Sequence, residues 1–589
     1  MEKPTSFYQE QLQKHASSLE AIKRKLFASS MVRLMVFCAA AFGVYMLFGN
    51  LKWVVAIILL AVALFLYLVS RHSDLLYERE RLRALHQINR TELKVLEHEF
   101  FELPEGNEFK DPMHHFSQDV DLFGRGSFYQ YANRTALKQG AETFAGLLKE
   151  NHIDHIAQKQ EAIKELAGMP EWRQNFSAIA LLVQTETDTE KIIGWLNRYT
   201  SFLPKSMRFV PWIFSAGTIA LFTVYFTFEI PDASLIFWLF FGLGITTLYI
   251  KKIMLLGNEA SKMQSTFQQY NRLLSQLEAT EFESAYLKDL KQTILGESEK
   301  TSTVIKRFSR ALNSIDKNNN MLYAFFANGL FLRSLTHSRT IEQWIEQYGS
   351  AVEGWFATIA HFDAYNSLGN FAFNHPDYTF PILGDDDVVL KAMGAGHPLL
   401  KPDKCVLNDF EIDRQQFFIV TGANMAGKST FLRTVSLQIV MANVGLPVYA
   451  QQVHYTPIKL ITSMRTTDSL TDDESYFFSE LKRLKFIVDE IQKDRYFIVL
   501  DEILKGTNST DKAKGSRKFI ERLVASKATG IIATHDLSLC EVADEFPQIE
   551  NHYFDAEIIN DELHFDYKFK RGVCQNMNAS FLLRKMQIV

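Results

Sequence analysis

The stretch FIVTGANMAGKSTFLRTV, Phe418 to Val435, decides the fold of the last third of this chain. Apolar residues of β-strand type precede the loop TGANMAGKS, and an apolar-periodic segment typical of a helix follows it. A strand, a loop of the pattern GxxxxGK[ST] and a helix, in this order, predict a cradle for phosphate groups, because backbone N–H groups and the helix N-terminus face the anion.

The residues of this loop predict an ATP site. Gly422 and Gly427 let the backbone curl around the phosphates. We expect Lys428 to reach the β- and γ-phosphates and the Ser429 hydroxyl to bind Mg²⁺. The predicted nucleotide-binding set is Gly422, Ala423, Asn424, Met425, Ala426, Gly427, Lys428, Ser429 and Thr430.

Two further apolar stretches predict buried strands that end in polar residues. YFIVLDE ends at Asp501, expected to hold Mg²⁺, and at Glu502, expected to orient or deprotonate the attacking water. GIIATHD places His535 where it can sense the γ-phosphate. Strand ends converge at the edge where open α/β sheets bind ligands, so we predict ATP hydrolysis with Lys428, Glu502 and His535 as catalytic residues. The alternatives are an acidic helix cap and a structural histidine.

Several segments resemble the MutS mismatch-repair family. TGANMAGKSTFLRTV and DEILKGTNSTD resemble two of its ATPase motifs, and SLTDDESYFFSELKRL resembles its signature segment through Ser475 and Glu480. GHPLL and VLND match its approach to the ATPase, and YKFKRGVCQNMNASFLLRKM matches its closing segment. LFGRGSFYQYANRTALKQGAETFAGLL, Leu122 to Leu148, resembles its helical core.

This resemblance implies an α/β ABC-type P-loop ATPase domain at 376–589 and an all-α MutS-like core or lever domain at 119–375, after an N-terminal region at 1–118. It also implies a homodimer that hydrolyses ATP with Mg²⁺, with Ser475 completing the ATP site in trans. Cys405 stands where the family has the aromatic residue that stacks on adenine.

The sequence also departs from the family at other positions, among them Leu504-Lys505 in place of its Gly-Arg. Ala423 and Ala426 replace its Pro and Gly, which leaves the charged residues of the loop intact. The family's N-terminal mismatch-recognition domain has no counterpart that we can identify, and Phe100-Phe101-Glu102 matches its motif in letters only.

Four uncharged apolar runs form two adjacent pairs. They are 34–48 with 53–69 and 209–228 with 235–250. Such runs approach the length that crosses a bilayer, and basic residues flank both pairs, whereas Lys52 is the only basic residue in either connecting turn. We predict two transmembrane helical hairpins in a multi-pass protein, for instance of a bacterial inner membrane, with both termini, the core and the ATPase cytoplasmic. The alternative is buried core helices.

Charge and composition leave the partner open. A net charge of −5 gives no global basic signature, so DNA contact would need a local patch such as Lys306, Arg307, Arg310 and Lys317, which a solvated helix face also explains. The four cysteines have no metal-site spacing.

The second hairpin interrupts the core where this family carries its levers. We therefore expect a membrane-anchored MutS-like ATPase that binds DNA; the alternative is a membrane-tethered, ATP-driven switch or scaffold acting on a protein or lipid partner without DNA.

Overall fold

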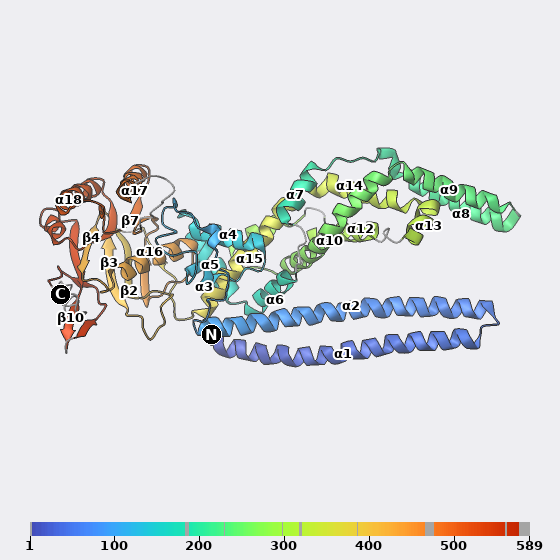
Figure 1. The fold of residues 1–589 in the computed structure, drawn as a ribbon, viewed down its shortest axis with the longest axis horizontal. Coiled ribbons are helices and arrows are strands. Elements are labelled where there is room, and N and C mark those ends of the chain that lie inside the picture. The colour runs from blue at the N-terminus through green and yellow to red at the C-terminus, as the bar shows by residue number, and fades with distance from the viewer. Residues whose placement is uncertain are drawn as a thin grey trace.

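The computed structural model describes residues 3–182, 188–228, 230–296, 299–316, 321–385, 387–465, 476–559 and 562–575. The molecule is elongated, with strands and helices mixed at one end and long helices reaching the other (Figure 1). The helical part consists of α1 (Pro4–Met46), α2 (Leu51–Leu96), η1 (Asn107–Phe109), α3 (Phe128–Ala132), α4 (Lys138–Lys149), α5 (Ile156–Ala167), α6 (Pro170–Leu181), α7 (Thr189–Arg198), η2 (Lys205–Arg208), α8 (Val210–Phe228), α9 (Asp232–Thr247), α10 (Ile250–Ala279), α11 (Ala285–Gln292), α12 (Thr301–Asp316), α13 (Met321–Phe331), α14 (Arg333–Tyr348), η4 (Gly349–Ala351) and α15 (Val352–Asn374).

The strands lie in the C-terminal part of the chain. They are β1 (Ile382–Leu383), β2 (Val388–Ala395), β3 (Asn408–Asp413), β4 (Phe417–Gly422), β5 (Gln452–Tyr455), β6 (Lys459–Ser463), β7 (Tyr496–Asp501), β8 (Thr529–Ala533), β9 (Ile549–Phe554), β10 (Ala556–Ile559), β11 (Glu562–Phe565) and β12 (Lys570–Arg571). The helical elements among them are α16 (Lys428–Val444), α17 (Tyr476–Glu490), α18 (Ser509–Ala525) and η5 (Leu537–Asp544).

The main sheet brings the predicted strand ends together. Among the described residues it has the order β12-β9-β4-β8-β7-β6, in which only β12 runs antiparallel to its neighbour. β4, β7 and β8 are adjacent and parallel, and almost every residue in them is buried. The apolar runs that precede Gly422, Asp501 and His535 therefore form central strands, as continuous apolar character predicts for a parallel sheet. A smaller sheet, β1-β5-β2-β3, packs beside it.

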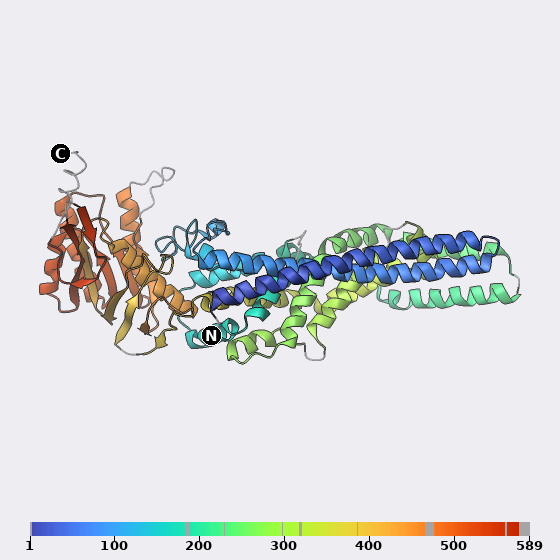
Figure 2. The same ribbon diagram turned by 90° about the horizontal axis from the view of Figure 1, so that it is seen from below.

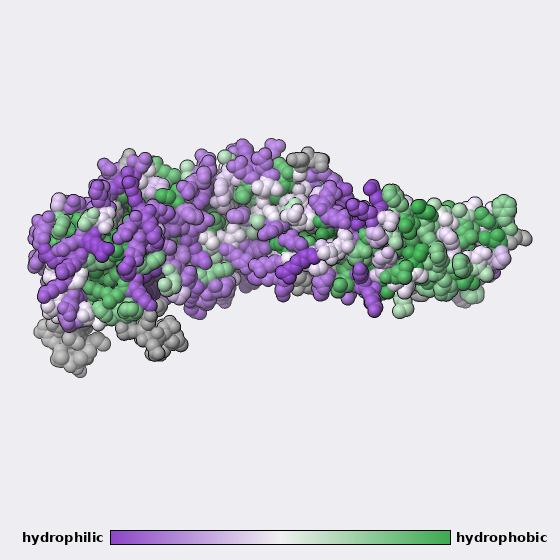
Figure 3. All heavy atoms as spheres, turned by 90° about the horizontal axis from the view of Figure 1, so that it is seen from above, coloured by the Kyte–Doolittle hydropathy of each residue, from purple (hydrophilic) through white to green (hydrophobic). Residues whose placement is uncertain are grey.

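The apolar runs lie in two hairpins at the end of the molecule far from the sheets. α1 with α2 and α8 with α9 reach this end in both ribbon views (Figures 1 and 2). Its surface is largely hydrophobic, whereas the rest of the visible face is mainly polar (Figure 3). Among the described residues, three helices are long and apolar enough to cross a membrane by length and composition, or up to four if α9 and α10 form one bent span.

The second hairpin continues into the helical core through a sharp bend. α9 ends at Thr247 and α10 begins at Ile250, and the two helix axes differ by 67°. α10 then packs against α12, α14 and α15, so its polar, periodic part lies within the helical core.

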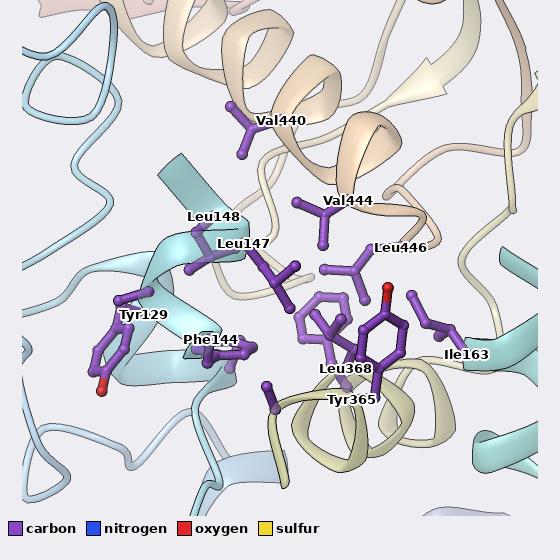
Figure 4. Close-up of a cluster of buried hydrophobic side chains, with 14 of the residues drawn as sticks. Tyr129, Phe144, Leu147, Leu148, Ile163, Tyr365, Leu368, Val440, Val444 and Leu446 are labelled. Atoms are coloured by element: carbon purple, nitrogen blue, oxygen red, sulfur yellow. The ribbon is translucent and has the colours of Figure 1, made fainter. Parts of the chain in front are cut away.

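The helical core and the main sheet share one hydrophobic cluster. Figure 4 shows Leu147 of α4, Ile163 of α5, Leu368 of α15 and Val444 of α16 facing one another. All four are buried. The helix that begins at the predicted phosphate loop therefore ends inside the helical core.

Gly445, directly after α16, allows a close approach between α16 and α5. Its φ is +92°, and a Cβ added there would lie 2.8 Å from Lys159 Cβ. We expect Gly445→Ala to lower the free energy of unfolding by more than about 1 kcal/mol, because both the left-handed backbone and the contact resist a side chain. Gly146→Ala in α4 is the control, because a Cβ there meets nothing within 4 Å. Thermal unfolding followed by circular dichroism measures both, and equal midpoints would contradict the close approach.

Candidate nucleotide-binding and catalytic site

The phosphate-loop motif lies between β4 and α16. Gly422 has φ +150° and Gly427 has φ +107°, so both use backbone conformations that L side chains rarely adopt. A Cβ on Gly422 would lie 2.6 Å from the Phe554 carbonyl oxygen. Ala423 and Ala426 are buried, whereas Asn424 and Met425 are exposed. The loop thus lies over the N-terminus of α16, where free N–H groups and the helix dipole favour an anion.

Lys428 lies beneath this loop. Its Nζ donates to the carbonyl oxygens of Gly422, at 2.8 Å, and Ala423, at 3.0 Å, and lies 3.3 Å from His535 Nε2. The side chain is buried, and burial lowers its pKa. Carbonyl oxygens are weaker partners for an ammonium group than anionic oxygens, so a phosphate at the loop would be a stronger acceptor for Lys428.

The two predicted Mg²⁺ ligands are adjacent. Ser429 Oγ donates to Asp501 Oδ2 at 2.6 Å, which joins the start of α16 to the end of β7. Mg²⁺ prefers oxygen ligands and binds through one or two carboxylates with phosphates and several waters. This pair fits such an ion. No cluster of three or more His, Cys, Asp or Glu that could hold a metal occurs within the described part of the chain.

Glu502 and His535 form a hydrogen-bonded pair. His535 Nε2 lies 2.8 Å from Glu502 Oε1, and Lys505 Nζ lies 3.8 Å from Oε2. The hydrogen bond to His535 lowers the pKa of Glu502 to about 2, although partial burial opposes this. Such a carboxylate is a weak base, so in this arrangement it suits the orientation of a water better than its deprotonation.

The loop after Glu502 is held by α17. Glu480 is buried, its Oε2 accepts from the Lys505 backbone N–H at 3.0 Å, and burial raises its pKa. A Cβ added to Gly506 would lie 2.8 Å from Phe477 Cβ, so the two segments are in close contact. Ser475, the residue predicted to act in trans, lies outside the described residues.

Tyr567 is a candidate site residue that the sequence did not identify. Its carbonyl oxygen accepts from Asn408 Nδ2 at 3.1 Å, and its ring carbon Cδ1 is 3.2 Å from a Cβ built on Gly427. The ring is 42% exposed. Cys405, at the family's aromatic position, offers no ring. Tyr567 begins the segment YKFKRGVCQ that resembles the family's closing segment, but the sequence did not indicate that the fold places this residue beside the loop.

Comparisons with known proteins agree with this geometry. Residues 418–584 match the family model of MutS domain V. MutS protein homolog 4 from Homo sapiens is 29% identical over 213 residues, 34% of this chain and 22% of that protein. DNA mismatch repair protein MutS from Thermotoga maritima is 30% identical over 36% of this chain and 27% of its own length. DNA mismatch repair protein MutS 2 from Halobacterium salinarum is 29% identical over 39% and 27%.

Residues 418–584 thus resemble MutS domain V, and over this region the chain is similar to MutS proteins. The matched region spans about a quarter of the length of these curated relatives. The helical architecture together with the mixed sheets fits a MutS-like core.

Removal of the Glu480 carboxylate should loosen the loop after Glu502. Glu480→Ala leaves the part-buried Lys505 N–H without its acceptor, which costs about 1 kcal/mol, so amide hydrogen exchange over 504–506 should be up to about tenfold faster. Asp489→Ala, at an exposed ion pair with Lys485 on the same helix, is the control. Unchanged protection in the Glu480 variant would show that α17 does not hold this loop.

Proposed function

We propose that this chain is a membrane-anchored MutS-type ATPase that hydrolyses ATP with Mg²⁺. The observation that carries the proposal is the continuous contact from Lys428 through His535 to Glu502, beside the Ser429–Asp501 pair, within a MutS domain V. An α/β P-loop ATPase fold accounts for this arrangement and for the parallel order of β4, β8 and β7.

Each residue has a distinct part in this mechanism. The backbone of the loop and Lys428 bind and orient the β- and γ-phosphates. Ser429 and Asp501 would hold Mg²⁺, which when bound neutralises charge on the phosphates. Glu502 orients the attacking water toward the γ-phosphorus. His535 positions Glu502 and lies within reach of the γ-phosphate. Tyr567 offers a ring for adenine, in place of the family's aromatic residue, whose position Cys405 occupies here.

The active unit in this proposal is a homodimer with composite sites, in which Ser475 acts in trans. Its support is the family and the position of α17, which begins one residue after Ser475. Because Glu480 on α17 also holds the loop after Glu502, a partner that engaged the start of α17 would act on the catalytic loop of the same chain. The two sites of a dimer would then be coupled through this helix.

Membrane insertion of the two hairpins explains the apolar end of the molecule. Large exposed side chains gather there, including Phe48, Leu60, Trp212 and Phe237, each more than 60% exposed. An apolar surface of this extent marks a membrane or protein interface. Both hairpins point the same way, so one bilayer can hold both (Figure 1). With the basic flanks as cytoplasmic markers, the core, the ATPase and both termini lie in the cytoplasm.

DNA is the first candidate for the partner. Its support is the family, since several relatives bear the name DNA mismatch repair protein. Lys306 and Arg310 on α12 are exposed, whereas Arg307 pairs with Glu299. Lys317 lies outside the described residues.

The second candidate is an ATP-driven switch or scaffold that acts on a lipid or protein partner without DNA. The apolar end of the helical part favours it, because an apolar surface does not bind phosphate backbones (Figure 3). In this function, dimer closure at the ATPase would move the helical core against the membrane hairpins.

Substitutions in the ATP site test the enzyme. Lys428→Ala should abolish ATP binding, because it removes the cation that faces the phosphates. Glu502→Gln should bind ATP but turn over at least about 100-fold more slowly, because the water loses its acceptor. Lys518→Ala, an exposed lysine on α18, is the control. Equilibrium nucleotide binding and phosphate release measure these effects, and normal hydrolysis by either site variant would refute the assignment.

A salt titration distinguishes the two candidate partners. If the first is correct, the full chain should bind duplex, mismatched or branched DNA with an affinity that falls linearly in log[salt]. Lys306→Ala combined with Arg310→Ala should reduce the slope by about 2 if α12 contacts phosphates. Absence of binding to all three DNAs at low salt would exclude DNA and leave the switch or scaffold.

A further inference from the structure

α13 is a short apolar helix that lies against the second hairpin. Its sequence, MLYAFFANGLF, has eleven residues and no charged side chain. It packs against α9 and α8, and Figure 1 shows it beside them at the apolar end. At about 1.5 Å per residue it is about 16 Å long, roughly half of the ~30 Å hydrocarbon core, so it is too short to cross a bilayer.

Small residues bring α13 and α9 close together. A Cβ on Gly242 of α9 would lie 2.3 Å from the Gly329 carbonyl oxygen of α13. A Cβ on Gly329 would lie 2.9 Å from Leu239 Cγ. The backbones therefore approach more closely than any larger residue permits, as glycines allow between helices packed in a membrane.

Hydrogen bonds satisfy the polar groups at this contact. Thr218 Oγ1 donates to the Leu330 carbonyl oxygen at 2.6 Å and accepts from Trp238 Nε1 at 2.8 Å. The carbonyl groups in the last turn of a helix have no partner within the helix. In hydrocarbon such a group needs an internal donor, and Thr218 provides one.

The other face of α13 is exposed and apolar. Met321 is 86% exposed and Phe326 54% exposed. Beside them runs a groove of about 390 Å³ lined by Tyr323, Phe326, Ala327, Leu330 and Phe331. This surface adjoins the exposed apolar surface of α8 and α9, which favours the same surroundings for both.

The C-terminal end of α13 is fixed to the helical core. Leu332 has φ +48° and turns the chain into α14. It is buried in a separate cluster with Phe214 of α8, Ile253 of α10, Leu335 of α14 and Leu203, which lies just before η2. Asn328 Oδ1 accepts from the Ser334 N–H at 2.8 Å across the turn. Movement of α14 would therefore reach α13 directly.

We propose that α13 is a third membrane-embedded element, which enters the bilayer beside α8 and α9 without crossing it, and that its groove takes lipid acyl chains. The proposal rests on the membrane insertion of the hairpins. It deepens that function, because α13 would connect the membrane to the helical core through α14, in addition to the connection from α9 to α10.

Photolabelling of the full chain tests the membrane insertion of the hairpins and the insertion of α13 separately. The protein is reconstituted into phosphatidylcholine bilayers that contain a diazirine in the acyl chain, and labelled peptides are identified by mass spectrometry. We expect label on α8, α9 and 321–331 and none on α12. Label on α8 and α9 without label on 321–331 would overturn the inference alone. Absence of label from all three helices would overturn membrane insertion itself.

A glycine substitution tests the contact with α9. Gly329→Leu should separate α13 from α9 and reduce the labelling of 321–331 by about fivefold relative to α8, because close packing holds the helix in place. Gly244→Leu is the control. Gly244 lies on α9, the helix that Gly329 contacts, and a Cβ there meets nothing within 4 Å. Unchanged labelling of the Gly329 variant, with label retained on α8, would show that this packing does not place α13.

Discussion

Helix α16 connects the nucleotide site to the rest of the molecule, because its two ends are fixed by different contacts. Its first residue, Lys428, bonds the carbonyl groups of the phosphate loop. Its C-terminal end, at Gly445, touches α5 so closely that no side chain fits. The seventeen residues of α16 form a helix about 25 Å long, and most of them are buried. Because packed interiors transmit strain, a displacement of the phosphate loop would reach α5 through this helix.

From α5 the same packing continues to both apolar hairpins. α15 packs against α4, α5, α6 and α10 and forms the axis of the helical part. At the start of the first hairpin, Tyr8 Oη donates to Asn374 Oδ1 at 2.6 Å, at the end of α15. Farther along, the Arg272 guanidinium of α10 lies 3.3 Å from the ring centre of Tyr77 in α2. α10 follows the second hairpin directly. Both hairpins thus depend on one set of core helices, although they are more than 100 residues apart in the sequence.

The sequence was informative where the chemistry is local, and less so where the fold decides. Apolar runs predicted β4, β7 and β8. The glycine pattern predicted the phosphate loop, in which the positive φ of Gly427 favours glycine. The contact between His535 and Glu502, by contrast, arises from the adjacency of β7 and β8, which no spacing in the chain reveals. Tyr567 was missed for the same reason. α13 was missed because eleven apolar residues are too few to distinguish a membrane segment from a core helix.

In the proposed ATP site, the contacts of Lys428 and His535 would link a bound phosphate to the Glu502 carboxylate. His535 Nε2 lies 3.3 Å from Lys428 Nζ and 2.8 Å from Glu502, so a γ-phosphate that binds Lys428 also competes for His535. Loss of the His535 hydrogen bond would remove the main cause of the lowered pKa of Glu502. The carboxylate becomes a stronger acceptor for the proton of water. Binding of the substrate would thus prepare Glu502 for its part in hydrolysis, and the resting site would hold it as a weak base.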